Sequence, residues 1–229
     1  MKLHRFLVAA AGVALAASGA FAQSKPTVAV LYFNDGAIGK ANEELKPLTK
    51  GIADVLISEL ADNPAIKVVE RDALQSILSE QKLATDGTVD KETAVKVGKL
   101  LSAHHMLTGG FVTDPSGTMV LTVRSVNVET SAIEYTASVT DKTASLLSII
   151  HRLAVKLNAG LKLPDIPRNV GEARAAKDEK IPFQAVMLYS RGLQAKDEGK
   201  KQDAIQLFNQ ALAAFPSYDA PNKELAKLK

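Results

Sequence analysis

The hydrophobic positions at the start of the chain change their spacing from one segment to the next. Residues 27–33, TVAVLYF, are continuously apolar and rich in β-branched side chains, as in a strand buried on both faces. Residues 34–46 are polar and contain two glycines, which predicts a loop. Apolar residues then recur at helical spacing over residues 48–60, which predicts an amphipathic helix with Asp54 and Glu59 on its outer side.

The next segment combines a short strand with a strong helix start. Residues 66–69 predict the strand, and Glu70 and Arg71 stand at its end. Asp72 is placed to cap the following helix, and Gln75, three residues later, completes a variant capping box. The two charges are therefore expected where a strand ends and a helix begins.

The pattern then changes from helix to antiparallel strands. Asp90 is placed to cap a third helix, and Gly98 inside it predicts a close packing contact, because glycine there costs about 1 kcal/mol against alanine. Gly109 and Gly110 predict a bulge or a close backbone approach in the next strand. Turn residues separate three strands, which predicts a meander, and a strongly apolar helix closes it; these elements cover residues 106–112, 118–128, 133–139 and 146–157.

The predicted order is β-α-β-α-α-β-β-β-α, an α/β fold with a mixed sheet and packed helices over residues 23–162. Residues 163–182 are rich in proline, charge and small side chains, which predicts a linker. Residues 183–229 predict a small C-terminal helical segment with a turn at Gly199 and Lys200.

The first 22 residues have the layout of a secretory signal peptide. Lys2 and Arg5 precede an apolar stretch, and Ala20-Phe21-Ala22 is a small-x-small cleavage site. An uncleaved anchor is the alternative, disfavoured by the short apolar stretch. The sequence has no cysteine, hence neither a lipid-attachment cysteine nor a disulfide framework. We therefore expect a soluble periplasmic protein.

Charge and hydropathy argue against two kinds of partner, nucleic acids and the membrane interior. The chain has 28 basic and 25 acidic residues, a balance of +3, and the signal segment holds two of the basic ones, so about +1 remains. This leaves no basic excess for nucleic-acid binding. No other segment is apolar for long enough to span a bilayer, so stable membrane insertion is not expected.

No residue set predicts catalysis, a cofactor or a metal. His104 and His105 are adjacent at a helix-to-strand junction, where their side chains diverge, and His151 lies alone on the outer face of the last helix. No serine lies in a G-x-S-x-G context. The glycines and lysine of residues 36–40 lack the spacing of a phosphate-binding loop. We therefore expect a protein that is not an enzyme.

For Glu70 and Arg71 an architectural role is favoured over ligand binding. Successive strand residues face opposite sides of a sheet, so the two side chains do not easily line one pocket. The Arg71 guanidinium can form a fixed fork with a carboxylate, and Glu70 lies where a helix N-terminus favours negative charge. We expect a structural or inter-subunit salt bridge.

Several stretches resemble the CsgG family, whose founding member is the curli secretion-channel protein of bacterial outer membranes. They are TVAVLYF, VLISELA, VVERDALQSILSEQKL, VGKLLSAHHMLTGGF and VRSVNVETSAIEYTASV, between residues 28 and 161. Asn127 and Ser131 replace the Asp and Gly of the family's hairpin. The resemblance implies an exported, non-enzymatic protein of envelope assembly. The family's pore needs a lipid anchor and membrane-inserting hairpins, which this sequence lacks, so we expect a soluble relative; a self-assembled ring stays open.

Residues 185–216 resemble one tetratricopeptide repeat. The positions expected to pack its helices are Leu188, Gly192, Ala204, Phe208, Ala211 and Pro216. Arg191 and Ala195 depart from the repeat's usual apolar and aromatic residues. Because one repeat cannot bury its own face, it should dock on the first domain, on another copy or on a partner.

Together these features predict a scaffold or adaptor of cell-envelope assembly or secretion that acts through protein–protein contacts. One alternative is an activator or accessory subunit of a peptidoglycan synthase, since the lipoproteins that stimulate such synthases are thought to share this fold; the missing lipid cysteine counts against it. An enzyme acting on cell-wall or small-molecule substrates is the alternative of another class. The expected partners are envelope proteins, and a homo-oligomer stays open.

Overall fold

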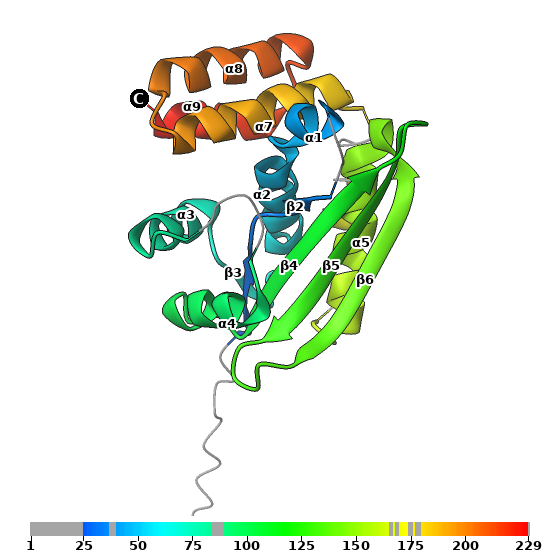
Figure 1. Cartoon of the computed structure of the whole chain (residues 1–229). Coiled ribbons are helices and arrows are strands. Elements are labelled where there is room, and N and C mark those ends of the chain that lie inside the picture. Colours follow the sequence, from blue (N-terminus) through cyan, green and yellow to red (C-terminus); the bar gives the residue numbers. More distant parts are fainter. Residues whose placement is uncertain are drawn as a thin grey trace, which may run out of the picture.

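One mixed sheet forms the centre of the molecule (Figure 1). The computed structural model describes residues 25–36, 40–83, 89–164, 167, 170–173, 176 and 180–228. The strands run in the order β3-β1-β4-β5-β6, and β2 pairs with β4 outside this path. They are β1 (Thr27–Val30), β2 (Asn34–Asp35), β3 (Lys67–Val68), β4 (His105–Thr113), β5 (Thr118–Asn127) and β6 (Ile133–Lys142). The predicted α/β class with a mixed sheet is confirmed.

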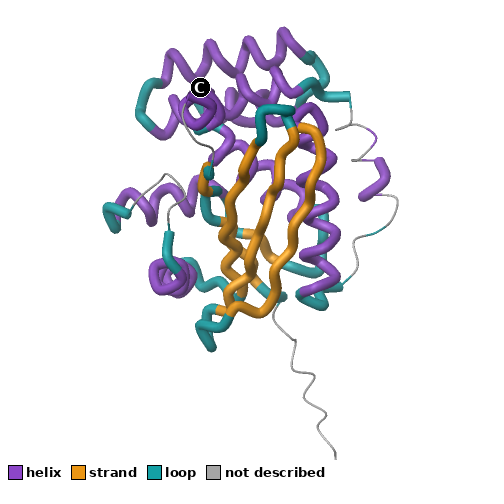
Figure 2. Tube along the Cα trace, turned by 45° about the vertical axis from the view of Figure 1, so that its right-hand side comes forward, coloured by secondary structure: helices purple, strands orange, loops and turns teal. Residues whose placement is uncertain are grey.

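The helices form a layer behind the sheet and a separate stack at one end. They are α1 (Lys40–Leu45), α2 (Leu48–Ala61), α3 (Arg71–Glu80), α4 (Lys91–Leu100), α5 (Leu146–Gly160), α7 (Phe183–Asp197), α8 (Lys201–Ala214) and α9 (Asp219–Lys227), with a 3₁₀ turn at Thr143–Ser145. Helices α2 and α5 pack together beneath one sheet face, and α7, α8 and α9 stack over the end of α2 (Figures 1 and 2).

Strand direction divides the sheet into two halves. Strand β1 pairs in parallel with both β3 and β4, as the helical connections between them require. Strands β4, β5 and β6 form the predicted antiparallel meander. Helix α5 packs against β5 and β6 and closes the domain.

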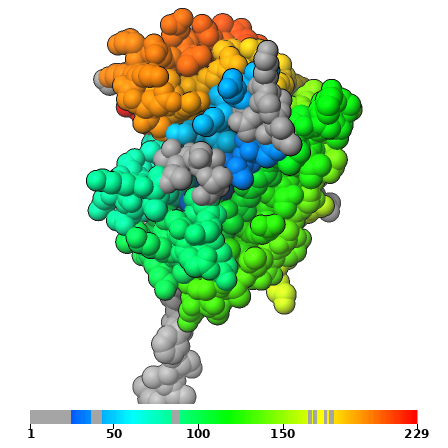
Figure 3. All heavy atoms as spheres, in the orientation of Figure 1, coloured from blue at the N-terminus to red at the C-terminus, as the bar shows by residue number. Residues whose placement is uncertain are grey.

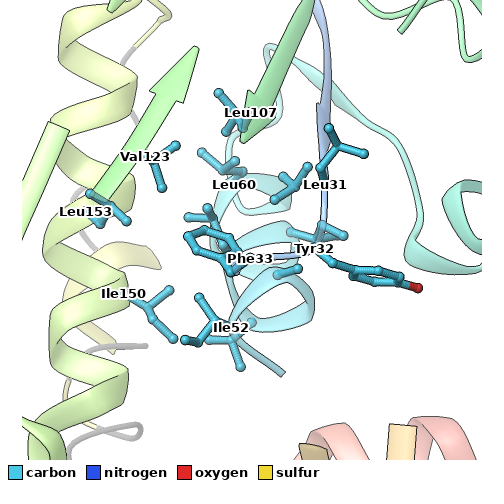
Figure 4. Close-up of a cluster of buried hydrophobic side chains, with 14 of the residues drawn as sticks. Leu31, Tyr32, Phe33, Ile52, Leu60, Leu107, Val123, Ile150 and Leu153 are labelled. Carbon is cyan, nitrogen blue, oxygen red and sulfur yellow. The ribbon is translucent and has the colours of Figure 1, made fainter. Parts of the chain in front are cut away.

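The first strand lies at the centre of the core. Every residue from Val28 to Phe33 is at most 1% exposed, as its continuous apolar run predicts. Phe33 points into the apolar cluster beside Ile52 and Ile150, whereas Tyr32 points the opposite way (Figure 4). This alternation places the Tyr32 hydroxyl on the side of α3 and the C-terminal helices.

Two glycine positions are explained by close packing. A Cβ on Gly98 would lie 2.6 Å from a Val128 methyl group, so the predicted close contact is confirmed. A Cβ on Gly109 would lie 2.2 Å from the Thr122 carbonyl oxygen and 2.9 Å from the Phe33 ring. The β4–β5 register continues unbroken through this point, so the close approach is confirmed and there is no bulge there.

Two expectations for residues 34–60 are wrong. The segment 34–46 was expected to be a loop, but it contains β2 and α1, elements too short to show a periodic pattern. Asp54 and Glu59 were expected to face outward, but both side chains are largely covered, Glu59 being 4% exposed. Helix α2 is apolar around most of its circumference because α5 and α7 pack on it as well as the sheet.

The C-terminal helices pack on each other and on α2. A Cβ on Gly192 would lie 2.4 Å from the Phe208 ring, so glycine lets α7 and α8 cross closely. A Cβ on Gly51 of α2 would lie 1.8 Å from the Ser190 hydroxyl oxygen of α7. The Tyr189 ring packs at 5.7 Å from Phe208 and at 5.4 Å from Tyr218 (centroid distances). This stack is therefore joined to the α/β part by direct packing.

The residues expected to pack the repeat occupy different environments. Ala204, Phe208 and Ala211 are fully buried on α8. Leu188 is partly buried against the core, and Pro216 is exposed just after α8. The turn predicted at Gly199 and Lys200 is confirmed, with Gly199 at φ +74°. In the segment expected to be a linker, residues 170–173 are helical.

Candidate functional site

The start of α3 brings Arg71 into the junction between α2 and the C-terminal helices. Helix α3 begins at Arg71, and Glu70 is its extended N-cap residue, without a side-chain capping hydrogen bond. The Arg71 side chain is 3% exposed, whereas Glu70 is exposed to solvent. The structure thus separates the adjacent charges: Glu70 precedes the helix in an extended conformation, and Arg71 is its first residue.

The expected capping box is wrong. Asp72 lies inside the first turn of α3, and its carboxylate accepts hydrogen bonds from Lys196 and Lys227, each at 2.9 Å. Gln75 does not return to the helix start: its Oε1 accepts a 2.7 Å hydrogen bond from the Tyr32 hydroxyl. The physical reason is competition, because the two side chains find partners in other elements.

Arg71 forms a fork with a residue 126 positions later in the chain. Its Nη1 lies 2.9 and 3.0 Å from the two carboxylate oxygens of Asp197, the last residue of α7, and 3.3 Å from the Tyr32 hydroxyl. Its Nη2 donates to Asp72 at 3.0 Å. Burial opposes the charge on Arg71, but Asp197 outweighs it and raises the pKa of the guanidinium.

Lys50 of α2 is a second cation on the same carboxylate. Its Nζ lies 2.6 Å from Asp197 Oδ2 and 5.0 Å from the centre of the Tyr32 ring. Burial, followed by the charge of Asp197, raises the pKa of the Tyr32 hydroxyl. Tyr32 is therefore a neutral hydrogen-bond donor in this cluster, and unsuited to act as a base near neutral pH.

A second layer of ion pairs joins α3 to α7 and α9. Glu224 of α9 accepts from Lys196 at 2.6 Å and from Lys227 at 2.7 Å, and both lysines also bind Asp72. Partial burial opposes ionisation of Asp72, but the hydrogen bonds from Lys196 and Lys227 outweigh it and lower its pKa to about 2. Asp72 is thus a permanent anion under physiological conditions.

Asp54 completes the cluster from α2. Its Oδ2 accepts a 2.5 Å hydrogen bond from the Tyr189 hydroxyl, and its Oδ1 lies 3.6 Å from Arg71 Nε. Burial raises the pKa of Asp54, although the Tyr189 hydroxyl and the charge of Arg71 act in the opposite direction. Asp54 therefore connects the phenol of α7 to the guanidinium of α3.

These residues, which we call the junction cluster, balance one another. They are Tyr32, Lys50, Asp54, Arg71, Asp72, Gln75, Tyr189, Lys196, Asp197, Glu224 and Lys227. Its four cations face four carboxylates across four helices, and a serine, threonine or cysteine nucleophile is not part of it. Among the described residues, no group of three or more His, Cys, Asp or Glu is arranged to hold a metal ion. The arrangement joins α2, α3, α7 and α9 through charge pairs.

The three histidines outside the signal segment each have a separate partner. His104 Nδ1 accepts from the Thr27 backbone N–H at 2.9 Å, and His105 Nδ1 lies 2.5 Å from Glu134. His151 Nδ1 lies 2.9 Å from Glu59, so it links α5 to α2 and is not on an open face as expected. The three side chains thus bind three different partners.

Sequence reasoning identified the junction-cluster residues of α3 and missed those of α7 and α9. It singled out Arg71, Asp72 and Gln75, which the structure brings together, and Glu70, which it leaves outside. It missed Asp197 and Glu224 because they pair over long sequence separations. The apolar circumference of α2 was a usable signal that its few polar residues are buried.

Comparison with known proteins finds one family model that is similar to part of the chain. The family model described as "Curli production assembly/transport component CsgG" matches residues 9–114. In the structure the described part of this segment runs from β1 to the end of β4 and includes Arg71 and Asp72. The sequence has no match among curated proteins.

Several solved structures show distant likeness. The LpoB C-terminal domain from Salmonella enterica is 14% identical over 52% of this chain and 83% of that chain, with a TM-score of 0.37. Lipoprotein GNA1162 from Neisseria meningitidis is 11% identical over 58% and 96%, with a TM-score of 0.41. A PelC dodecamer from Paraburkholderia phytofirmans is 14% identical over 60% and 89%, with a TM-score of 0.39. Similarity at this level does not indicate function. The family match and the contacts within this chain are the basis for a functional proposal.

Proposed function

We propose, from the match of residues 9–114 to the CsgG family model, that the chain is an exported, non-enzymatic scaffold or adaptor of cell-envelope assembly or secretion. It acts through protein–protein contacts in the periplasm. Residues 1–22 supply the export signal in this proposal, although they lie outside the described residues. Within the described part of the chain, no helix has the length and hydrophobicity needed to cross a membrane.

The observation that carries the proposal is the pairing inside the junction cluster. Arg71 is the most heavily bonded charge of the family-matched segment, and its bonds go to Asp197, Asp72 and Tyr32 of the same chain. Arg71 Nε makes no hydrogen bond and lies 3.6 Å from Asp54 Oδ1, whereas both Nη atoms are paired. In this proposal the buried pairs fix the elements relative to each other. A perturbed ionisable cluster can also mark an active site, but here the charges are paired with one another and the cluster holds no serine, threonine or cysteine.

The same cluster supports a structural role for the C-terminal helices. It ties α7 and α9 to α2 and α3, so the helical stack and the α/β part present one continuous surface. We infer that Arg71, Asp72 and Gln75 are positioning residues for this stack. We also propose that this stack is a tetratricopeptide-like repeat.

The test is chemical crosslinking in intact cells that produce the full-length chain with a C-terminal tag. We expect the tagged chain in the periplasmic fraction, crosslinked to one or a few envelope proteins. A variant lacking residues 2–22 should stay in the cytoplasm and lose these crosslinks. A chain that remains cytoplasmic with its signal intact, or that yields no envelope partner, contradicts the proposal.

A second assay distinguishes the synthase-activator alternative. The purified chain without residues 1–22 is added to purified peptidoglycan synthases, and glycan polymerisation is followed. We expect no stimulation if the chain is a scaffold or adaptor of another assembly. A reproducible increase in polymerisation would replace the scaffold proposal by the activator alternative.

A further inference from the structure

Among the described residues, helices cover the sheet face opposite α2 and α5 at one end only. Helix α4 packs there on the lower end of β4 and β5, where Gly98 contacts Val128 and Met106. Beyond α4 the outward side chains of the meander reach solvent, and Figure 3 views the molecule from this side. An antiparallel sheet can leave one face open, so the fold itself does not require a cover.

A hollow with a volume of about 530 Å³ lies on this open face. Its floor is formed by outward positions of β4 and β5, which the sheet register places in neighbouring rows. The residues that matter for its chemistry are Asn34, Thr108, Val112, Val120, Thr122 and Arg124. Glycine at position 110 lets the backbone of β2 approach β4 beside the hollow, because a Cβ there would lie 2.9 Å from the Asn34 carbonyl oxygen.

Arg124 is the feature that points to a ligand. Its side chain is exposed and makes no ion pair or hydrogen bond with any described residue, unlike Arg71 and Arg152, which are both paired. It lies in one row with Thr108, whose hydroxyl can donate to the same anion. The carboxylate of Asp90 at the rim already accepts the Thr93 backbone N–H at 2.7 Å. The hollow thus offers a guanidinium that has no partner among the described residues, and guanidinium is the group that binds carboxylates in a bidentate manner.

An apolar surface adjoins this cation. Val112 and Val120 are opposite each other in the register and are 53% and 40% exposed. They are two of the five large hydrophobic side chains that are exposed among the described residues. The hydroxyls of Thr122 and Ser138, 3.1 Å apart, extend the row toward β6. Apolar and cationic groups side by side match a segment that carries an aliphatic side chain next to a carboxylate.

We propose that this hollow is the docking site for a protein segment that pairs an acidic residue with Arg124 and packs an aliphatic residue on Val112 and Val120. The hollow lies open across two flat strands, whereas a small molecule is usually enclosed over most of its surface. The inference rests on the proposed adaptor function and names the surface through which a partner is held. Arg124 supplies selectivity for the acidic residue, because an unmatched charge there is penalised.

The test places a photocrosslinking residue, p-benzoyl-phenylalanine, at Val112 in the full-length chain inside producing cells. A matched probe at the exposed Gln206 of α8 reports contacts on a remote surface. We expect the Val112 probe to capture one partner protein, at a segment that mass spectrometry shows to contain Asp or Glu beside an aliphatic residue. Arg124→Glu should reduce the crosslinked yield about tenfold or more, and Arg124→Gln should reduce it less.

Two controls make the result specific. Arg191→Glu, the same charge change at an exposed position of α7, should leave the yield unchanged, and equal urea midpoints should show that the Arg124 variants are folded. Replacing the acidic residue of the captured segment by lysine should restore the yield with Arg124→Glu. A yield that does not respond to Arg124→Glu overturns the proposal, and so do crosslinks only to a second copy of the chain.

The outcome also separates this proposal from the one it rests on. If chemical crosslinking captures an envelope partner but the Val112 probe captures none, the adaptor function stands and this docking surface is wrong. If neither method captures a partner, both proposals are wrong.

Discussion

Replacing Arg71 by alanine is expected to lower the free energy of unfolding by about 3–5 kcal/mol. The substitution removes a buried guanidinium and leaves its partners in place, so Asp197, 4% exposed, loses two hydrogen bonds at 2.9 and 3.0 Å. Breaking a buried pair from one side is costly because the remaining charge cannot reach water.

The structure places the loss toward the lower end of this range. Asp197 keeps the 2.6 Å ion pair with Lys50, and Asp72 keeps its bonds to Lys196 and Lys227. Tyr32 loses the 3.3 Å contact with Arg71 but keeps Gln75 as its acceptor. We therefore expect about 3 kcal/mol for Arg71→Ala.

Urea denaturation of the chain without residues 1–22, followed by circular dichroism, measures this loss. The control is Arg152→Ala, because Arg152 pairs with Asp141 at 2.5 Å but is 43% exposed, and it should cost about 1 kcal/mol or less. A double-mutant cycle with Asp197→Asn should give a coupling energy of about 1–3 kcal/mol. A loss no larger than that of Arg152→Ala, or a coupling energy near zero, would refute the structural role of the pair.

Three further predictions test other contacts. Gly51→Ala should destabilise the chain by about 1–3 kcal/mol in urea, because its Cβ would lie 1.8 Å from Ser190 Oγ; Ser190→Gly should recover part of the loss. Phe208→Ala should cost about 3–5 kcal/mol by leaving a cavity between α7 and α8, and limited proteolysis should then cut within the C-terminal helices first. The pKa of Asp72 is lowered to about 2 in the folded chain, below about 3.9 when unfolded, so its contribution to stability is present above pH 4 and lost as the pH falls from about 4 to 2. Asp72→Asn should flatten the urea midpoint over that interval, and an unchanged pH slope would contradict this assignment.

Sequence periodicity was sufficient for elements that bury one face along several turns or residues. The apolar run of residues 27–33 and the helical stripes of α2 and α5 needed no tertiary information, and the meander followed from alternation and turn residues. Helix α1 and strand β2 were missed because elements of six and two residues are too short to show a repeated pattern.

The candidate site was harder to predict than the fold because its pairing is long-range. Asp54 is polar on an apolar helix, and a helix with one open face would place it in solvent. Its burial depends on α7, which returns to α2 more than 130 residues later and brings Tyr189 to it. The predicted capping box of α3 is wrong for the same reason, because Lys196 and Lys227, from the far end of the chain, bind Asp72.

The separation of Arg71 from Asp197 also sets the order in which the molecule can be completed. A chain that emerges from its N-terminus contains α2 and Arg71 long before the last residue of α7 exists. Closing a chain loop of this length is a late step in folding. The chain loses conformational entropy before the contact between Arg71 and Asp197 can stabilise it. Until then the apolar flank of α2 and an unpaired guanidinium remain in water, a state recognised by chaperones and proteases. The ion pair between Arg71 and Asp197 can therefore form only in a chain that extends through α7.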